Sequence, residues 1–198
     1  MTTKDEILAK IYTAGVVRSR DVEDWGVSRK WLQRLAEQGY LYRTTRGVYI
    51  PADAEPTENQ SLAEVATRVP NSVFCLLTAL RFHDLTTQNP FEVWIALPSR
   101  ARRPQLDYPP LHIASFTGAA FTEGIEEHPV GGTKLRVYTP AKTVADCFKY
   151  RNKIGLDIAL EALRDYRRKF RGGNDELWHY AQICRVANVM RPYMEAIA

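Results

Sequence analysis

A short helix predicted at residues 28–38 carries the side chains of this sequence that are best suited to hydrogen-bond with DNA bases. Its apolar residues Leu32, Leu35 and Ala36 share one side, so the opposite side is polar. Arginine and glutamine form paired hydrogen bonds with guanine and adenine edges in the major groove. The residues that we expect to enter the groove are Arg29, Lys30, Gln33 and Arg34.

The residues around this helix predict the order helix, turn, helix. Residues 21–25 form a short helix that Gly26 closes. Ser28 is suited to cap the second helix, and Gly39 is suited to the left-handed conformation that ends a helix. Because Ser28 adjoins the residues expected to face DNA, we include it among the candidate DNA contacts.

Two short strands predicted at residues 41–43 and 48–50 form a hairpin after the second helix. The tight turn between them places Arg43, Thr45 and Arg46 at or near a wing that contacts backbone phosphate. This order of elements predicts an N-terminal winged helix-turn-helix that binds double-stranded DNA. Use of the same element to bind another protein remains an alternative.

Positive charge is concentrated in this segment. Residues 28–50 contain five Lys or Arg and one acid, whereas the whole chain has a formal net charge of only +4. A basic strip beside a groove-sized helix favours DNA because it releases counterions from the phosphates. The local charge therefore supports a nucleic-acid partner more than the total does.

The bulk composition is that of an ordinary globular protein. The chain has 198 residues, of which 45% are hydrophobic and 25% are charged, enough for one sizeable core and a small second domain. It contains no apolar run of about 18 residues, the length needed for a membrane span. Residues 1–15 form an amphipathic pattern in which Thr3 and Glu6 have capping-box spacing, unlike a signal peptide. We expect a cytoplasmic protein with no membrane partner.

A change of composition at residues 51–60 marks a linker, because two prolines and polar residues follow without an apolar period. It separates a predicted DNA-binding domain at residues 1–53 from a larger domain at residues 61–198. We expect the larger domain to begin with two helices, the first opened by a capping box at Ser61 and Glu64 and the second at residues 73–85.

The rest of the larger domain combines strands with helices. Segments rich in β-branched and aromatic residues predict a small, mainly antiparallel sheet from residues 91–97, 111–116, near 122–128 and 134–139. Thr139 and Pro140 then open a helix that ends near residue 150. Further helices are predicted at roughly 155–171, 174–186 and 188–197. The fold class is therefore α+β, a winged helix-turn-helix followed by an α+β domain with a helical C-terminal half.

Several segments together resemble a known family. The most specific is TPAKTVADCFKYRNKIGLDIALEALRDY at residues 139–166. It is supported by RGVYIP (46–51), LLTALRFHDLT (76–86), VWIALPSRARRP (93–104) and LWHYAQICRVANVMRPYMEAI (177–197). In this order and over nearly the whole chain, they resemble the AbiEi-type antitoxins, transcriptional regulators of type IV toxin-antitoxin systems.

The resemblance implies a function for both domains. The winged helix would bind inverted repeats in the promoter of its own operon and act as an autorepressor. The larger domain would support repression and counteract a nucleotidyltransferase-like toxin encoded alongside. A homodimer on the DNA is compatible with inverted repeats, and dimerisation in solution or only on the operator remains open.

Two basic clusters in the larger domain have several explanations. The helix predicted at roughly 155–171 carries one cluster near its C-terminal end, formed by Arg164, Arg167, Arg168 and Arg171. The loop before Pro104 carries the other, formed by Arg100, Arg102 and Arg103. Cations are favourable at helix C-termini and are usually solvated. Contacts with DNA or with the toxin are the other two explanations, and all three remain open.

We expect no catalytic residue, metal or cofactor. The histidines at positions 83, 112, 128 and 179 have no metal-ligand spacing. Asp146 and Cys147 lie in an apolar helical stretch, and Cys75 and Cys184 are also in apolar segments, so we expect buried free thiols. A nuclease-like enzyme remains an alternative, although Glu92 lacks the matching Glu-x-Lys spacing.

A third class is a winged-helix regulator controlled by a small ligand in the larger domain. Trp94, Phe116, Phe121 and Tyr138 are the aromatic residues that could line its cavity. Aromatic residues on strands more often belong to the hydrophobic core.

Overall fold

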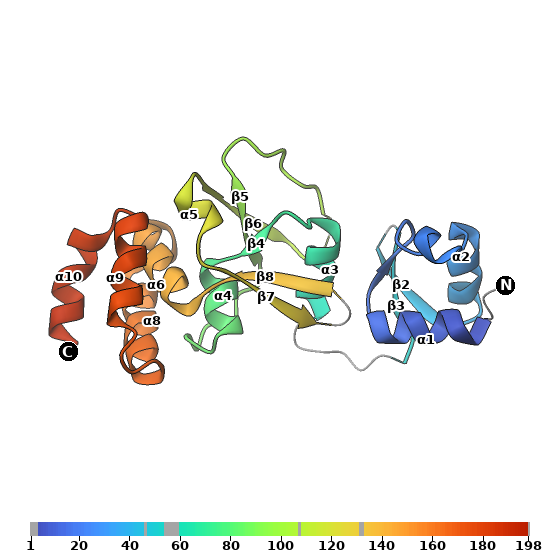
Figure 1. The fold of residues 1–198 in the computed structure, drawn as a ribbon, viewed down its shortest axis with the longest axis horizontal. Helices are drawn as coiled ribbons and strands as arrows, with labels where there is room; N and C mark the ends of the chain where they lie inside the picture. The colour runs from blue at the N-terminus through green and yellow to red at the C-terminus, as the bar shows by residue number, and fades with distance from the viewer. Residues whose placement is uncertain (1–3, 46, 54–59, 107, 131–132, 198) are drawn as a thin grey trace. The chain divides into compact units, whose positions relative to one another are not determined.

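The computed structural model describes residues 4–45, 47–53, 60–106, 108–130 and 133–197 (Figure 1). The chain divides into two compact units, which we call unit 1 (residues 1–70 and 128–135) and unit 2 (residues 71–127 and 136–198). Most of the predicted linker lies outside the described residues, and the two domain ranges predicted from the sequence stay predictions.

Unit 1 begins with helices and a small antiparallel sheet. The elements in order are α1 (Lys4–Ala14), β1 (Val17–Arg18), the 3-10 helix η1 (Glu23–Trp25), α2 (Arg29–Glu37), β2 (Leu41–Thr45) and β3 (Val48–Pro51). The sheet has the order β1-β3-β2. Residues from all of these elements except η1 form one hydrophobic core, to which Ile11, Leu32 and Tyr49 belong. The capping box predicted at Thr3 and Glu6 involves a residue outside the described ones.

The turns around α2 form as their residue types predict. Gly26 closes η1 with a φ of 74°, and Gly39 follows α2 with a φ of 79°, values that residues with a Cβ rarely adopt. Ser28 occupies the N-cap of α2 with extended backbone, but its side chain makes no capping hydrogen bond. The first turn of α2 is therefore stabilised by other contacts.

The hairpin predicted after α2 is confirmed. β2 and β3 pair antiparallel, with Tyr42 opposite Ile50 and Arg43 opposite Tyr49, and a bulge follows Arg43. Gly47 lies in the turn with a φ of 77°. The amide of Ser19 donates to the carbonyl of Gly47 over 2.9 Å, which ties the hairpin to the residue after β1.

Helix α3 (Gln60–Arg68) completes the described helices of unit 1. The capping box predicted at Ser61 and Glu64 is wrong, because Ser61 lies inside the helix and Glu64 is buried. Ala63 packs with Val16 and Val48 in a small cluster. Glu64 lies on α3 next to Ala63 and is only 8% exposed, whereas a capping residue is usually exposed.

A five-stranded sheet in the order β6-β5-β4-β8-β7 is the second sheet of the chain. Its strands are β4 (Val73–Phe74), β5 (Val93–Pro98), β6 (Leu111–Phe116), β7 (Ile125–Val130) and β8 (Thr133–Tyr138). β5 runs parallel to β6 and antiparallel to β4, and β4 runs parallel to β8. The sheet is therefore mixed, which corrects the prediction of a mainly antiparallel one.

The central strand β4 explains the difference. The sequence pattern predicts that Val73 and Phe74 open a helix, but they form a two-residue strand, and α4 (Leu76–Phe82) starts only after them. Both residues are fully buried, so they have no alternation of apolar and polar positions. A short apolar run of this kind cannot be assigned to strand or helix from periodicity alone.

Helices form most of the rest of unit 2. They are α5 (Ala119–Thr122), α6 (Pro140–Lys149), α7 (Arg151–Ile154), α8 (Leu156–Lys169), α9 (Asn174–Ile183) and α10 (Ala187–Ala196). The helical C-terminal half expected from the sequence is thus confirmed, and Figure 1 shows α6, α8, α9 and α10 gathered at one end of this unit. The chain is α+β, with a small antiparallel sheet, a larger mixed sheet and helices.

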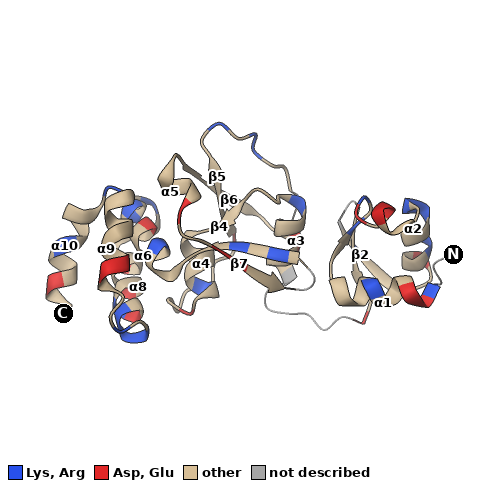
Figure 2. Cartoon of the chain, viewed as in Figure 1, with Lys and Arg blue, Asp and Glu red and all other residues tan. Residues whose placement is uncertain are grey.

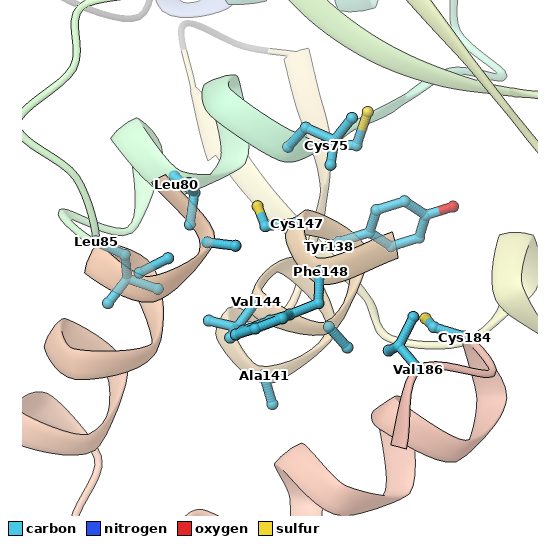
Figure 3. Close-up of a cluster of buried hydrophobic side chains, with 14 of the residues drawn as sticks. Cys75, Leu80, Leu85, Tyr138, Ala141, Val144, Cys147, Phe148, Cys184 and Val186 are labelled. Atoms are coloured by element: carbon cyan, nitrogen blue, oxygen red, sulfur yellow. The ribbon is translucent and has the colours of Figure 1, made fainter. Parts of the chain in front are cut away.

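Helix α6 lies at the centre of the hydrophobic core of unit 2 (Figure 3). Every residue from 141 to 148 is buried, among them Val144 and Phe148 with no exposed surface. Thr139 caps the helix, since its Oγ1 accepts a hydrogen bond from the amide of Lys142 over 3.3 Å, and Pro140 stands at the first helical position. A local signal thus starts the helix around which the unit packs.

The two capping positions predict different effects on stability. Thr139→Ala removes a bonded cap and should lower the free energy of unfolding by about 1 kcal/mol. Ser28→Ala removes a hydroxyl without a capping bond and should change it by less than about 0.5 kcal/mol. Urea denaturation of both variants checks this, and equal losses would contradict it.

Candidate nucleic-acid interface

Helix α2 has one buried and one exposed face. Leu32 and Leu35 are 0% and 2% exposed and belong to the core of unit 1. The candidate contacts Ser28, Arg29, Lys30, Gln33 and Arg34 are all exposed. Figure 2 shows the basic residues on this helix. The core holds α2 in place while its polar residues stay accessible to a partner.

Three of these polar side chains make no polar contact with the described part of the protein. Among the described residues, no hydrogen bond or ion pair involves the side chains of Lys30, Gln33 and Arg34. Their donors and acceptors therefore face solvent. Such groups can exchange water for a partner without breaking a protein contact.

Arg29 differs from its neighbours because it is paired with an acid. Its Nε donates to Oε1 of Glu23 over 2.8 Å, and its Nη2 donates to Oε2 over 3.1 Å. This forked pair joins the first residue of α2 to η1, and both side chains remain about half exposed or more. Arg29 would have to leave or share Glu23 in order to pair with a base.

The hairpin residues are described only in part. Arg43 is exposed on β2 and interacts within the protein. The side chain of Thr45 and the whole of Arg46 lie outside the described residues. Their expected role at a wing stays a prediction.

The two basic clusters predicted in unit 2, one at the end of α8 and one in the loop before Pro104, lie mostly on its surface. Nη1 of Arg167 donates to the carbonyl of Met194 over 2.6 Å, so this arginine joins α8 to α10. Arg168 pairs with Asp165 at 3.0 Å. The other members are exposed: Arg164, Arg171, Arg100, Arg102 and Arg103. Contact of either cluster with DNA or a toxin stays a prediction.

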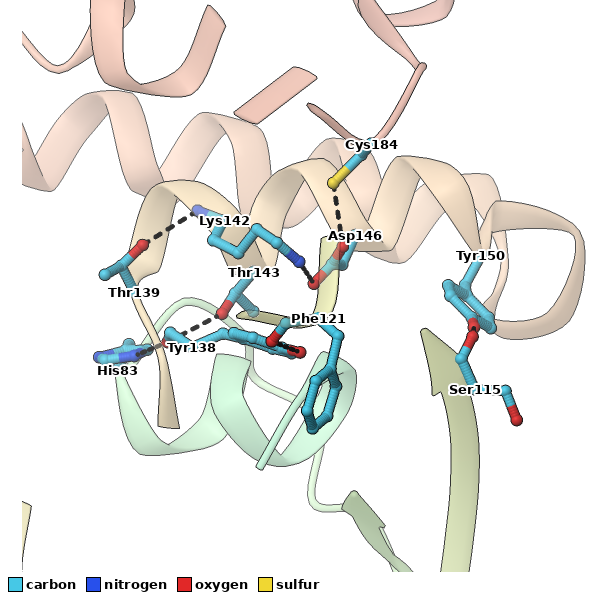
Figure 4. A network of polar contacts seen from close by, with 10 residues as sticks. All are labelled: His83, Ser115, Phe121, Tyr138, Thr139, Lys142, Thr143, Asp146, Tyr150 and Cys184. Carbon is cyan, nitrogen blue, oxygen red and sulfur yellow. Dashed lines mark hydrogen bonds and ion pairs between the residues drawn. The ribbon is translucent and has the colours of Figure 1, made fainter. Parts of the chain in front are cut away.

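Unit 2 contains a buried ion pair that the sequence pattern did not predict. Nζ of Lys142 donates to Oδ2 of Asp146 over 2.6 Å, and neither side chain has exposed surface (Figure 4). Sγ of Cys184 donates to Oδ1 of the same carboxylate over 3.1 Å. The ammonium group also lies 4.0 Å from the ring centre of Tyr138 and 4.9 Å from that of Phe116. These contacts join α6 to α9, β8 and β6.

Further hydrogen bonds surround this pair (Figure 4). The hydroxyl of Tyr138 donates to the carbonyl of Phe121, and the hydroxyl of Thr143 donates to the carbonyl of Tyr138. Nε2 of His83 lies 2.7 Å from the same Tyr138 carbonyl. The signal in the sequence is the spacing of Lys142 and Asp146, four residues apart on one helix. Nothing local shows that this side of the helix is buried.

The three cysteines are buried free thiols, as predicted. Burial raises the pKa values of Cys75, Cys147 and Cys184, and the carboxylate of Asp146 raises them further. Their thiolates are therefore disfavoured at neutral pH. This environment opposes a nucleophilic role, which depends on the thiolate.

We also searched the described residues for a metal centre and for a membrane-spanning helix. The described part of the chain contains no group of three or more His, Cys, Asp or Glu placed to hold a metal ion. No helix there is long and apolar enough to cross a membrane.

Four aromatic residues are candidates either for a ligand cavity or for the hydrophobic core. Of these, Phe116 belongs to the core and also lines a pocket of about 360 Å³. Asp146, Lys149, Tyr150 and Arg185 line the same pocket. Trp94 and Tyr138 belong to the hydrophobic core, and Phe121 packs against it.

The first part of the chain matches a known protein family. Residues 11–52 match the model of a family described as the transcriptional regulator AbiEi antitoxin, which confirms the resemblance over η1, α2 and the hairpin. No curated protein matches the chain. The chain is also similar in fold to the crystal structure of the RV2827C protein from Mycobacterium tuberculosis, with a TM-score of 0.56 and 14% identity over 98% of this chain and 79% of that one.

The buried pair predicts a non-additive effect on stability. Lys142→Met leaves the Asp146 carboxylate buried without its main partner and should destabilise the protein by about 3–5 kcal/mol. The double variant Lys142→Met/Asp146→Leu removes both charges and should recover most of that loss. Denaturation of the single and double variants checks this, and additive losses would contradict the coupling.

Proposed function

We propose that the chain is a sequence-specific transcriptional autorepressor whose residues 1–53 form a winged helix-turn-helix. The proposal is carried by the exposed face of α2, on which Lys30, Gln33 and Arg34 have no partner within the described part of the protein. A buried opposite face and a following hairpin support it. The match of residues 11–52 to a family of regulators supports the same conclusion.

In the proposed complex, α2 enters the major groove of double-stranded DNA. Gln33 and Arg34 are suited to hydrogen-bond with base edges, and Lys30 with a base or a phosphate. The wing residues Arg43, Thr45 and Arg46 would contact the adjacent backbone, which sets the register without reading sequence. Arg29 would position α2 through Glu23 and contact DNA only with its remaining donors.

We propose a separate role for the larger domain, residues 61–198, in neutralising a toxin. We propose that it counteracts a nucleotidyltransferase-like toxin of a type IV system, on the basis of the resemblance of residues 139–166 and the match of residues 11–52. Two copies on an inverted repeat of the protein's own promoter would double the DNA contacts. The exposed arginines at positions 100, 102, 103, 164, 168 and 171 are candidate contacts with DNA or toxin.

A second candidate function is control of the regulator by a small ligand. The pocket beside Phe116 favours it, because Lys149 and Arg185 bring positive charge to a cavity with an aromatic wall. Thermal denaturation with a panel of anionic metabolites tests it. A ligand that raises the midpoint and changes DNA affinity would support this function, and no shift with any compound would oppose it.

The main test is fluorescence-anisotropy binding to DNA from upstream of the protein's own gene and to scrambled DNA of equal length, over a series of salt concentrations. Selective binding with a steep salt dependence is the expected result. Weak binding that does not depend on sequence would instead assign the helix and hairpin to contact with another protein.

One variant in α2 and one in η1 should separate the reading of bases from the positioning of α2. Arg34→Ala should weaken binding to the operator by about 1–3 kcal/mol, and much less to scrambled DNA, if it contacts a base. Glu23→Gln should release Arg29 and change operator binding by less than Arg34→Ala does. The same anisotropy assay measures both, with Lys10→Ala as the control for loss of one exposed charge on α1.

Equal weakening of operator and scrambled DNA by Arg34→Ala would assign that residue to phosphate. No effect on either DNA would remove Arg34 from the interface.

A further inference from the structure

Unit 1 contains an open hollow of about 330 Å³ that the sequence pattern does not indicate. Four arginines line it, together with the hydroxyl-bearing residues Ser19 and Thr67. The arginines come from three places: Arg18 and Arg20 from β1 and the residues after it, Arg29 from α2, and Arg68 from the end of α3. Positive side chains far apart in the sequence thus converge on one hollow.

Two polar atoms at this hollow lack a hydrogen-bond partner in the described part of the chain. Oγ1 of Thr67 is buried and has no hydrogen-bond partner among the described residues, and the whole residue is only 3% exposed. Nε of Arg18 is also buried without a hydrogen bond, and its nearest acid is Asp21, with Oδ2 3.3 Å away. Buried polar groups without partners are rare in folded proteins and call for an explanation. A ligand oxygen in the hollow would supply the missing partner.

Several acids lie near the hollow, but none is among the described residues that line it. Asp21 lies 3.3 Å from Arg18 and 3.5 Å from Arg20, so one carboxylate is shared by two guanidinium groups. Glu23 is taken by Arg29. Burial of Glu64 on α3 raises its pKa, and the nearby charge of Arg68 lowers it. Because the described residues that line the hollow include four arginines and no acid, the lining is basic and suits an anion.

The position of the hollow indicates which anion. It lies between the hairpin turn, where Gly47 and Val48 line it, and the first residue of α2. In the proposed function, α2 and the hairpin turn are the two places where DNA contacts the protein. A DNA strand that runs between them carries a phosphate about every 3.4 Å along the helix axis.

We propose that this hollow binds a backbone phosphate of the DNA through Arg20, Arg68 and the hydroxyl of Thr67. The proposal rests on the proposed function and extends it by naming contacts outside the helix and wing. A phosphodiester oxygen accepts charge-assisted hydrogen bonds from guanidinium groups and an ordinary one from a hydroxyl. Because every sequence has this phosphate, the contact adds affinity and register without selectivity.

The test measures DNA binding by the full chain as a function of salt, on operator and scrambled DNA. Arg20→Ala and Arg68→Ala should each weaken binding to both DNAs by the same factor. Each should also reduce the slope of log K against log salt by about 0.9, the value for one lost phosphate contact. The matched control is Lys10→Ala, which removes an exposed charge of unit 1 outside the hollow and should leave the slope unchanged.

Thr67→Val separates a binding role from a structural one. Valine keeps the shape of the side chain and removes a hydroxyl that has no partner among the described residues, so the thermal midpoint should stay the same or rise. DNA affinity should nevertheless fall by roughly 2- to 10-fold, the factor of one hydrogen bond. A lower midpoint with unchanged DNA affinity would overturn the role assigned to Thr67.

The results distinguish this inference from the function on which it rests. If the wild type binds neither DNA, the proposed function fails. If the wild type binds the operator selectively and the three hollow variants behave like Lys10→Ala, only the phosphate contact in the hollow is overturned.

Discussion

The buried ion pair between Lys142 and Asp146 constrains the packing of unit 2, because neither buried charge can be left without its partner. It places a charged side chain from one turn of α6 against a carboxylate from the next, with no exposure of either. Charges in such surroundings are tolerated only when each has close partners. Asp146 has a second one in Cys184 beside α9, and Lys142 lies over the rings of Tyr138 and Phe116. The partners of the pair come from the sheet and from the end of α9, so the sheet and the C-terminal helices meet around α6.

The same network gives Asp146 a role in packing, because its carboxylate is bonded on both sides within the core. Thr139 and Pro140 start the helix, and the pair fixes its rotation. Burial disfavours the thiolates of Cys147 and Cys184, which pack in the core, and Cys184 also donates to Asp146. The residues of unit 1 are organised in the opposite way, since the charges of α2 face solvent while its leucines are buried. Among the described residues, the polar side chains of Lys30, Gln33 and Arg34 without a protein partner lie on the exposed face of this helix.

Much of the candidate interface could be predicted because its signals are local. Glycines at 26, 39 and 47 mark positive φ values, and the spacing of leucines marks the buried side of α2. The hydrogen-bond partners of individual arginines could not be predicted, because they come from other elements of the fold. Arg29 belongs to one predicted set with Lys30 and Arg34, yet it differs from them because it is tied to an acid of η1. Arg167 likewise belongs to a predicted surface cluster but donates to a carbonyl of α10.

The sequence by itself determined the α+β class, the helix and hairpin at residues 28–51, the capped start of α6 and the buried state of the cysteines. Tertiary structure decided that Val73 and Phe74 form the central strand of a mixed sheet. It also decided that Thr67 and Arg68 join Arg18 and Arg20 around one hollow. The physical reason is range: backbone preferences and amphipathic periods act over a few residues, whereas strand neighbours, burial and ion pairs depend on which distant residues the fold brings together.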